Sequence, residues 1–574
     1  MKTALFCLVI IIADITSVTA QGYDDRYIDE WIRFYPSRAL AQGMHNSIFY
    51  IEDLSSQRIN QWLIYNKKML SQTDSALEHK QGDRINLRLL RTQIRTEIDK
   101  WELDAPHQRS LSLYSSLIVN GGKRVMDASF LTPNEKVQLI CERFGQIQKL
   151  CNSAKSSIQS VDQGDLERSL RQLEAAEKFY KDELLNLVGN QKLSVCSDFK
   201  TQSSQTADNI RSLITFINSE ILPRTKETEP ILGRDEYTRK LSLYVDASLT
   251  PEKLADMALQ EIEMVRKLMG EVAQSYFVSN YPKQKLPSDY NELMRLTLAD
   301  MEKDAPKSGP EYLEFWKGLS QSSIKFIEEK KIATLPKNET LQILTAPESA
   351  GPAARIGWVS SAPPFSPNPL TTLYVPSIPE SFPDKERTEF WASFNRPFNR
   401  IIVIHELYPG HYMQNKIARE SPHSIRLLFP FGIYSEGWAT FCERVALDAG
   451  WEAQNKLTLL AHLRKRLENA NRAYTSVMVH CNGWDKDKTI SFSIEKSLLA
   501  PQFAKSLWGR LVDSPMQMTS YFLGGTQFNE LLAHEQKRLG TQFNLTEFMD
   551  TILRAGPIPI DEFYEMFNPS LAGK

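Results

Sequence analysis

The segment from Ile401 to His411 holds the side chains best suited to chemistry, because four apolar residues run directly into a His-Glu pair and a second histidine follows. In the zinc-protease pattern H-E-x-x-H, the histidines stand four residues apart on one helix, and the glutamate reaches the metal-bound water. Here His405 and His411 are six residues apart. On a helix of 3.6 residues per turn, that spacing turns the second imidazole about 120° away from the first. A regular helix therefore cannot bring both to one metal ion.

Pro409 and Gly410 lie between the two histidines and offer a way around this problem. Pro409 has no backbone N–H, and its ring collides with the carbonyl four residues earlier, which belongs to His405, so a break or bulge is predicted there. Gly410 permits backbone conformations that other residues rarely adopt. We expect the chain to step outward here and to return His411 to the metal that His405 binds, with Glu406 as catalytic base.

Glu436 is the predicted third ligand. It follows His411 by 25 residues, a gap that suits a neighbouring antiparallel helix. Ser435 would cap this helix. Glu436, Thr440 and Glu443 would share one face at i, i+4 and i+7 spacing, so we expect Glu436 to bind the metal and Glu443 to support a ligand from behind. A glutamate on a helix commonly faces solvent, but one beside Gly-Trp in an apolar helix favours the metal site.

Two histidines, one glutamate and an open fourth position are the ligands of a catalytic zinc site, so we expect one zinc ion per chain. A water bound to the zinc would have a pKa of about 7. Glu406 would take a proton from this water and pass it to the leaving amine. His480 and Tyr521 are candidate donors to the oxyanion, although either type of residue can be buried for packing alone. Arg472 could hold a substrate carboxylate or pair with a helix-face glutamate. The other histidines, His462 among them, fit no ligand pattern.

The strings HELYPGHYMQ and SEGWATFCE, at 405–414 and 435–443, resemble the paired signatures of the domain of unknown function 885 family. That family is predominantly helical and is similar to the zinc peptidases of the neurolysin and angiotensin-converting-enzyme type. The resemblance spans nearly the whole chain after residue 20. It includes an early stretch from Tyr35 to Gly43 and a late pattern made of Gln517, Tyr521 and Gly524. It implies a zincin-like helical fold with a deep channel and hydrolysis of peptide or similar amide bonds.

The family's segment after the second signature is matched at Arg472, His480 and Trp484, which would lie at the channel wall. Arg472 and Gln517 are the candidate substrate contacts. Two departures are present: Ser476 to Val479 replaces Asp-Thr-Gly-Ile, and Met549 replaces the histidine of Phe-His-Asp. Val477, Met478 and Met549 therefore support an alternative hypothesis, a secreted binding protein that keeps the helical shell without catalysis. A serine hydrolase is not indicated, because no G-x-S-x-G elbow occurs in the chain.

The elements that must position these residues are mainly helices, so the predicted fold class is mainly α with a small β element near residues 350–380. Helix starts are indicated at Thr132-Pro133 and Thr250-Pro251, where an N-cap threonine precedes proline and an apolar stripe. Between 347 and 383 nine prolines surround the strand-like pieces 354–359 and 372–375. Proline confines strands to sheet edges, and an edge strand beside a cleft can pair with an extended peptide. An ordinary ordered loop is the other interpretation.

The start of the chain predicts export. Lys2 precedes an apolar run from 4 to 13 and the small-residue pattern Val18-Thr19-Ala20, as in a signal peptide that covers 1–20. After it we expect a helical region, 21–245, and a metallohydrolase region, 246–574, with the metal site in 401–443. Two sequons, at Asn338 and Asn544, suit a secreted glycoprotein.

The composition of the chain limits the kinds of partner that it can be expected to bind. With 68 basic and 70 acidic residues the formal net charge is −2, so no net field would recruit nucleic acid or an anionic membrane. No stretch after the signal peptide approaches the roughly 20 apolar residues that a membrane helix needs. Of six cysteines, Cys7 lies in the signal peptide, and the remaining five would form one or two disulfides. The expected partner is a peptide or small amide substrate, and the oligomeric state stays open.

Overall fold

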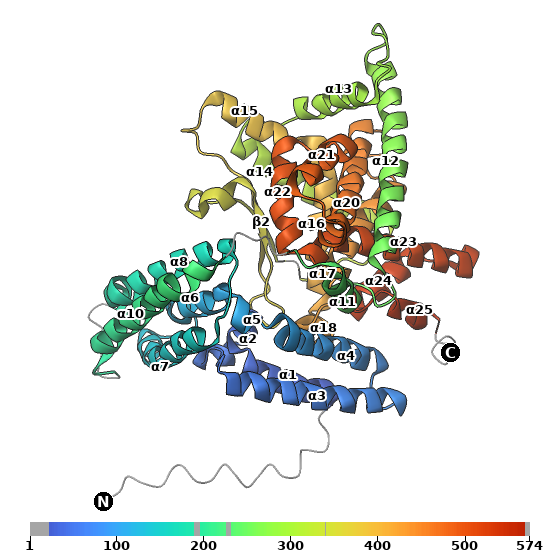
Figure 1. Ribbon diagram of the computed structural model, residues 1–574. Coiled ribbons are helices and arrows are strands. Elements are labelled where there is room, and N and C mark those ends of the chain that lie inside the picture. The colour runs from blue at the N-terminus through green and yellow to red at the C-terminus, as the bar shows by residue number, and fades with distance from the viewer. Residues whose placement is uncertain (1–21, 189–195, 226–230, 339, 569–574) are drawn as a thin grey trace, which may run out of the picture. The chain divides into compact units, whose positions relative to one another are not determined.

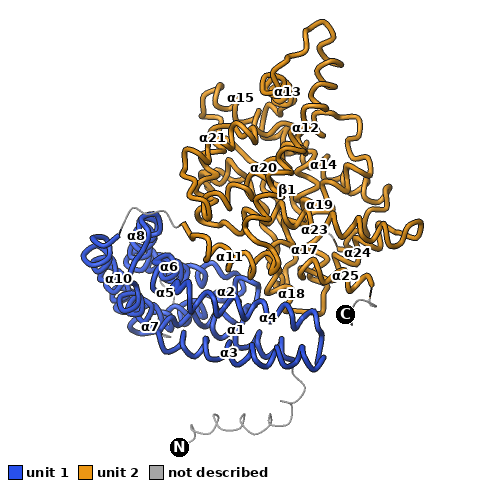
Figure 2. The backbone as a smooth tube through the Cα atoms, turned by 45° about the vertical axis from the view of Figure 1, so that its right-hand side comes forward, with its two compact units in different colours: residues 1–229 blue, residues 230–574 orange. Residues whose placement is uncertain are grey.

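The computed structural model describes residues 22–188, 196–225, 231–338 and 340–568 of the chain. Helices dominate it, as predicted, and one small sheet is the only β structure in these ranges (Figure 1). The chain forms two compact units that divide between residues 229 and 230 (Figure 2). The predicted signal peptide lies outside the described residues. No helix within them is long and apolar enough to cross a membrane.

The first unit consists of helices that bury apolar stripes against one another. Their bounds, with η for 3-10 and π segments, are α1 (Tyr23–Phe34), α2 (Pro36–Ala41), η1 (His45–Phe49), α3 (Ser56–Glu78), α4 (Arg84–Asp99), η2 (Lys100–Asp104), α5 (Pro106–Arg109), α6 (Leu111–Asp127), α7 (Pro133–Ser157), α8 (Gln163–Lys178), η3 (Phe179–Glu183), α9 (Leu184–Val188), α10 (Phe199–Phe216), η5 (Ile217–Ile221) and η6 (Leu222–Arg224). The predicted helix start at Thr132 is confirmed, since Thr132 and Glu135 form a capping box. One disulfide, Cys141–Cys196, agrees with the predicted number.

Tyr35, from the early family-like stretch, belongs to a buried polar cluster of the first unit. Glu97 on α4 accepts hydrogen bonds from Tyr35 Oη at 2.6 Å, Trp62 Nε1 at 2.9 Å and Trp101 Nε1 at 3.2 Å. Glu97 is almost fully buried, so these donors replace the water that its carboxylate loses on folding. The cluster ties four segments together, which gives Tyr35 a structural role.

The second unit contains the remaining helices and the sheet. The helix bounds are α11 (Arg234–Tyr244), α12 (Pro251–Asn280), α13 (Tyr290–Lys303), α14 (Gly309–Lys330), η7 (Glu348–Arg355), α15 (Asp384–Ser393), α16 (Arg396–Glu406), α17 (His411–Ala418), α18 (Ser424–Leu428), α19 (Tyr434–Asp448), α20 (Lys456–Asn482), α21 (Lys486–Ser497), α22 (Pro501–Asp513), α23 (Pro515–Leu539), η8 (Gly540–Gln542), α24 (Leu545–Ala555) and α25 (Glu562–Phe567). Thr250 caps α12 by accepting a hydrogen bond from Lys253 N, as predicted. The long helix α20 packs against α12, α16 and α23.

The sheet has the strand order β1-β3-β2, with β1 (Leu341–Thr345) parallel and β2 (Trp358–Ser360) antiparallel to the central β3 (Thr371–Val375). The strand expected over 354–359 is shorter than predicted, because η7 extends to Arg355 and Gly357 has a φ of 74°. β2 is an edge strand, as its prolines indicated. The expectation of an edge position is wrong for the piece at 372–375, whose prolines lie outside its ladder. β1 was not predicted.

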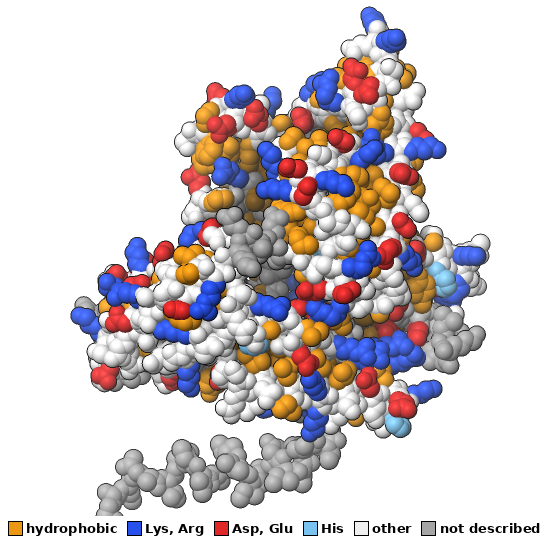
Figure 3. Space-filling model, in the orientation of Figure 1, with side chains coloured by type: hydrophobic (Ala, Val, Ile, Leu, Met, Phe, Trp, Pro, Cys, Tyr) orange, Lys and Arg blue, Asp and Glu red, His pale blue; other side chains and the backbone are white. Residues whose placement is uncertain are grey.

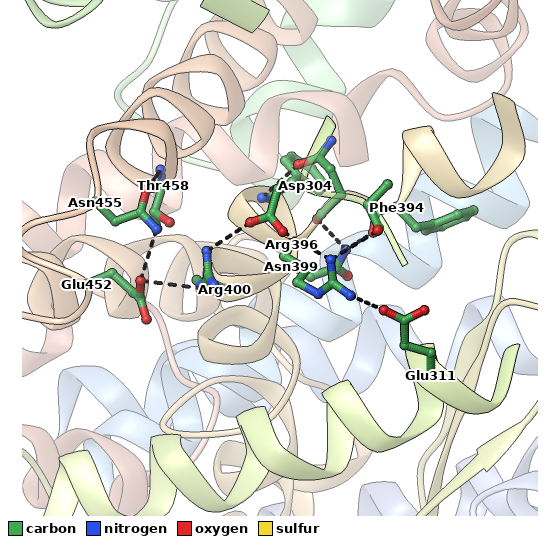
Figure 4. Close-up of polar contacts among 12 residues, drawn as sticks. Asp304, Glu311, Phe394, Arg396, Asn399, Arg400, Glu452, Asn455 and Thr458 are labelled. Carbon is green, nitrogen blue, oxygen red and sulfur yellow. Dashed lines mark hydrogen bonds and ion pairs between the residues drawn. The ribbon is translucent and has the colours of Figure 1, made fainter. Parts of the chain in front are cut away.

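Ion pairs fasten the first half of α16 to its neighbours (Figure 4). Arg396 forms an ion pair with Asp304 at 3.0 Å and another with Glu311 of α14. One turn later, Arg400 lies 3.6 Å from Asp304 and 3.5 Å from Glu452. Both arginine side chains are largely buried, so these charges are screened less than surface pairs. They fix the position of the helix whose other end begins the HELYPGH motif.

The buried cluster around Glu97 predicts a stability difference between two substitutions. Glu97→Leu should lower the free energy of unfolding by about 2 kcal/mol more than Glu97→Gln, because leucine leaves the Tyr35 and Trp62 donors without an acceptor, whereas Trp101 Nε1 keeps Tyr35 Oη at 2.7 Å and glutamine keeps one acceptor oxygen. Urea unfolding followed by the fluorescence of Trp62 and Trp101 measures the difference. Equal stability of the two variants would contradict this account of the cluster.

Candidate metal centre

The side chains of His405, His411 and Glu436 converge on one point. Oε2 of Glu436 lies 3.5 Å from Nε2 of His405 and 3.4 Å from Nε2 of His411, and the three ligand atoms lie within 4.8 Å of one another. Ligands at about 2.0–2.1 Å from a tetrahedral zinc ion are about 3.3 Å apart, close to these separations. Oε2 of Glu436 is buried and has no hydrogen-bond partner among the described residues, as expected of an atom that a cation would satisfy. The donor set therefore fits zinc.

A turn at Leu407 to Gly410 makes this convergence possible. α16 ends at Glu406 and α17 begins at His411, so the predicted break at Pro409 is confirmed, and the Tyr408–Pro409 peptide bond is cis. Gly410 has a φ of −69° and a ψ of −141°, a combination outside the main helical and extended regions, in agreement with the unusual dihedrals expected here. The position also needs space, because a Cβ there would overlap the carbonyl oxygens of Ile404 and His405. The chain can fold back onto the end of α16 only with glycine here.

Trp438 holds the turn in place from the neighbouring helix α19. Its Nε1 donates a hydrogen bond of 2.9 Å to the carbonyl oxygen of Pro409, and the indole is fully buried. The thiol of Cys442, one turn further along α19, lies 3.8 Å from the same oxygen. Trp438, two residues after Glu436 in the sequence, therefore fixes the segment that delivers the second histidine.

Gly437 and Gly524 let α19 and α23 cross with their backbones in contact. A Cβ on Gly437 would lie 2.5 Å from the Cα of Gly524, and one on Gly524 would lie 2.6 Å from the Cα of Gly437, distances that real Cβ atoms do not show. This crossing places Glu436 of α19 next to Tyr521 of α23, whose pKa the glutamate raises. The contact between the two helices therefore explains both Gly437 of the SEGWATFCE string and Gly524 of the late family-like pattern.

Glu443 supports His405 from behind, as predicted. Its Oε1 lies 2.8 Å from Nδ1 of His405 and accepts a hydrogen bond of 2.6 Å from Lys465 Nζ, while its Oε2 lies 3.3 Å from Nδ1 of His462. Glu443 is 1% exposed, so all its partners are protein groups in the interior. A carboxylate on the far nitrogen orients an imidazole and raises its basicity as a metal ligand. His462 and Lys465 were missed, because in the Lys- and Arg-rich run from 462 to 466 nothing separates inward-facing from outward-facing charges.

His411 has a looser support. Its Nδ1 lies 3.4 Å from Ser435 Oγ and 3.5 Å from Gln414 Oε1, and these two atoms are 3.3 Å apart. The predicted capping role of Ser435 is wrong: α19 begins at Tyr434, its N-cap is Ile433, and no side chain caps it. The Ser435 hydroxyl instead faces the candidate ligand.

The electrostatics of the cluster keep its carboxylates ionised. Burial raises the pKa of Glu436, but His405 and His411 lower it more, so that the pKa falls well below its ordinary range. The pKa of Glu443 is also well below that range, because Lys465 and the histidines outweigh burial. Burial and Lys465 lower the pKa of His405, but Glu436 and Glu443 raise it by more, so the pKa of His405 lies above its ordinary value. The ionised carboxylates of Glu436 and Glu443 therefore both lie against the imidazole of His405, and that of Glu436 also lies against His411.

Tyr521 and Arg472 lie beside the cluster. Burial and Glu436 raise the pKa of the Tyr521 phenol above its ordinary value, against the opposite effect of Arg472, so the hydroxyl stays protonated and can donate. The guanidinium of Arg472 lies 5.0 Å from the centre of the Tyr521 ring. Gln517, one turn before Tyr521 on α23, is exposed. Whether these residues contact substrate stays a prediction.

The structure does not bring His480 to the cluster, which corrects its assignment as a catalytic donor. Its Nδ1 accepts a hydrogen bond from Leu232 N at 3.2 Å, its Nε2 lies 2.9 Å from the carbonyl oxygen of Leu511, and the ring stacks on Tyr237. His480 follows His462 on α20 by 18 residues, or about 27 Å along the helix. It is a satisfied buried histidine. Trp484 likewise packs on Tyr474 and Phe492 in an apolar cluster.

A cavity of about 600 Å³ reaches Glu406. Its walls come from the end of α15, from β2 and β3, and from α20 and α22, and a hollow with hydrophobic walls is visible between α15 and α22 in Figure 3. The Glu406 carboxylate makes no hydrogen bond or ion pair within the described ranges. It is therefore available to a molecule in the cavity.

The fold and the site define a mainly helical protein with a candidate metal centre of two histidines and a glutamate. Residues 36–565 match the family described as "Bacterial protein of unknown function (DUF885)", and the chain belongs to this family. No curated protein matches it.

Two solved structures share the fold. A candidate lipoprotein of unknown function from Shewanella oneidensis has a TM-score of 0.84 and 20% sequence identity, over 95% of this chain and 98% of that one. A candidate lipoprotein from Colwellia psychrerythraea has a TM-score of 0.69 and 16% identity, over 96% and 100% of the two chains. At these identities the similarity shows the fold alone.

The support of His405 by Glu443 predicts an effect on metal affinity. Glu443→Gln should weaken zinc binding about 10- to 100-fold, because the amide supports the imidazole less strongly than the carboxylate. Competition with a chelator measures the affinity, with circular dichroism as the check on folding. Asp448→Asn, which removes a carboxylate from an exposed ion pair on the same helix, is the matched control and should bind zinc normally. An unchanged affinity in Glu443→Gln would refute this role.

The backbone crossing of α19 and α23 predicts that a single methyl group is harmful there. Gly437→Ala and Gly524→Ala should each lower the free energy of unfolding by about 1–3 kcal/mol and weaken zinc binding, because the helices must separate. Gly509→Ala on α22 is the control, since its Cβ would meet no atom within 4 Å. At position 509, alanine should raise the free energy of unfolding by up to about 1 kcal/mol, because it favours the helix more than glycine does. Thermal unfolding and zinc titration test the set, and three variants that behave alike would speak against the crossing.

Proposed function

We propose that this protein is an exported, zinc-dependent hydrolase that cleaves peptide or similar amide bonds. The observation that supports it best is the convergence of His405, His411 and Glu436 beside Glu406, whose carboxylate faces a cavity. Three protein ligands of these types, with a carboxylate next to them, are the arrangement of a catalytic zinc site, whereas structural zinc sites have four protein ligands. A kinship with the neurolysin and angiotensin-converting-enzyme type of peptidase is part of this proposal.

In this mechanism the chain's own residues position the reactants and move the proton. Zinc held by His405, His411 and Glu436 would act as a Lewis acid and would lower the pKa of a bound water to about 7. Glu406 takes a proton from the attacking water and delivers it to the amine as the C–N bond breaks, so one water adds across the bond. Tyr521, whose phenol burial and Glu436 keep protonated, would donate a hydrogen bond to the oxyanion.

The form of the cavity supports a peptide as substrate. β2 is an edge strand, and Gly357, Trp358 and Val359 line the cavity. An extended peptide can add to such an edge through main-chain hydrogen bonds, while apolar side chains of the wall receive its side chains. Export is supported by the signal-like sequence at 1–20.

The alternative, an inactive binding protein, was motivated by departures from the family's pattern. Val477 and Met549 are 1% and 0% exposed, so both are core residues of α20 and α24. Apolar side chains suit these places for packing alone. These two departures therefore give no specific reason to expect a loss of catalysis.

Glu406→Gln tests the proposal. We expect zinc to remain at one ion per chain while turnover of a peptide library falls about 10²- to 10⁴-fold, because only the proton transfer is lost. Glu420→Gln, an exposed glutamate just after α17, is the control and should keep full activity. His411→Ala should lose both zinc and turnover.

Two results would contradict the proposal. Full turnover in Glu406→Gln would mean that another group is the base. A zinc-loaded wild-type protein that cleaves no member of the library would favour the binding-protein alternative.

A further inference from the structure

Four arginines line the cavity that Glu406 faces, and one of them, Arg355, is the last residue of η7. Arg464 and Arg472 come from α20, and Arg510 comes from α22. Their nearest anionic partner is Glu468, whose carboxylate lies 3.5 Å from Arg464 and 3.7 Å from Arg472, longer than a good charge-assisted hydrogen bond. Four arginines against two lining carboxylates, Glu406 and Glu468, leave the cavity with an excess of positive charge.

Arg510 carries most of this excess. It is exposed on α22, and within the described ranges its guanidinium pairs with no carboxylate. A guanidinium presents a planar fork of donors that matches a carboxylate with two parallel hydrogen bonds. An arginine that lines a cavity without such a partner is free to bind a carboxylate of a ligand.

Arg472 lies close to the candidate metal centre. Arg472 stands over the ring of Tyr521 at 5.0 Å, and Tyr521 and Glu436 are neighbours where α19 and α23 cross. Glu406 lines the same cavity. A ligand carboxylate held by Arg472 would therefore lie within a short peptide's reach of the group that we propose as catalytic base.

Most of the remaining wall is apolar or aromatic, with Trp358, Phe390 and Phe398 among the lining residues. A carboxylate gains more from an arginine in such surroundings than in open water, because the local dielectric constant is lower. The edge of β2 offers main-chain groups to an extended chain on the same cavity. The cavity thus combines a place for a peptide backbone with a place for one negative charge.

We propose that Arg472 and Arg510 form a subsite for a substrate carboxylate, so that this protein prefers short peptides with a free carboxylate close to the bond that is cut. The proposal rests on the function proposed above, since it names the substrate class of the same cavity. The carboxylate belongs either to the C-terminus or to an acidic side chain. Both sources have the same chemistry, and the experiment separates them.

The test measures binding, so that it does not depend on turnover. Zinc-loaded Glu406→Gln is titrated by calorimetry with three short peptides of one sequence: a free C-terminal acid, its C-terminal amide, and an amide whose last residue is glutamate. We expect at least one carboxylate-bearing peptide to bind about 10- to 100-fold more tightly than the plain amide. The peptide that gains identifies the source of the carboxylate.

The arginine variants are made in the same Glu406→Gln background. Arg472→Gln with Arg510→Gln should abolish the preference while zinc content stays at one ion per chain. Arg510→Gln alone reduces the preference and, at an exposed position, leaves the fold intact. Arg554→Gln, which removes an exposed arginine paired with Asp550 on α24, is the control and should keep the full preference.

Equal binding of all three peptides would overturn the subsite, and so would a preference that survives in the double variant. A protein that discriminates the peptides as expected but hydrolyses none of them in its wild-type form would refute the hydrolase and leave the carboxylate subsite standing. A protein that hydrolyses peptides but binds all three test peptides equally would refute the carboxylate subsite and leave the hydrolase standing.

Discussion

The candidate site depends on how closely α19 packs against its neighbours. On one side Gly437 lets its backbone touch that of α23, on another Trp438 binds the Pro409 carbonyl in the turn before α17, and further along Glu443 binds His405 on α16. Three contacts from one helix thus place two histidines and a neighbouring tyrosine around Glu436. Any change that moves α19 outward would separate groups that must stand about 3.3 Å apart to share a zinc ion.

Charge is arranged differently behind and in front of this centre. Behind it, Glu443 is buried among Lys465, His462 and His405, so a full set of partners offsets the cost of desolvation. In front, the Glu406 carboxylate and the Arg510 guanidinium face the cavity and have no such partner among the described residues. Buried groups that are satisfied hold a structure in place, whereas unpaired charges that line a cavity are suited to a ligand.

Local signals in the sequence predicted much of this structure. The helix starts at Thr132 and Thr250 and the break at Pro409 follow from the backbone chemistry of single residues and are present. The spacing of Glu436 and Glu443 predicted which carboxylate faces the ligands and which supports them. His462 and Lys465 could not be predicted, because their role depends on the rotation of α20 against α19. His480 misled for the same reason: its partners, Leu232 and Leu511, come from distant segments.

The central claim is that His405, His411 and Glu436 bind one zinc ion and leave a position open. X-ray absorption at the zinc edge of the metal-loaded protein tests it most directly. The account predicts one zinc per chain, with four nitrogen or oxygen ligands at about 2.0–2.1 Å and the outer-shell scattering of two imidazoles. A sulfur ligand at about 2.3 Å, a shell without histidine scattering, or a protein that binds no zinc would contradict it.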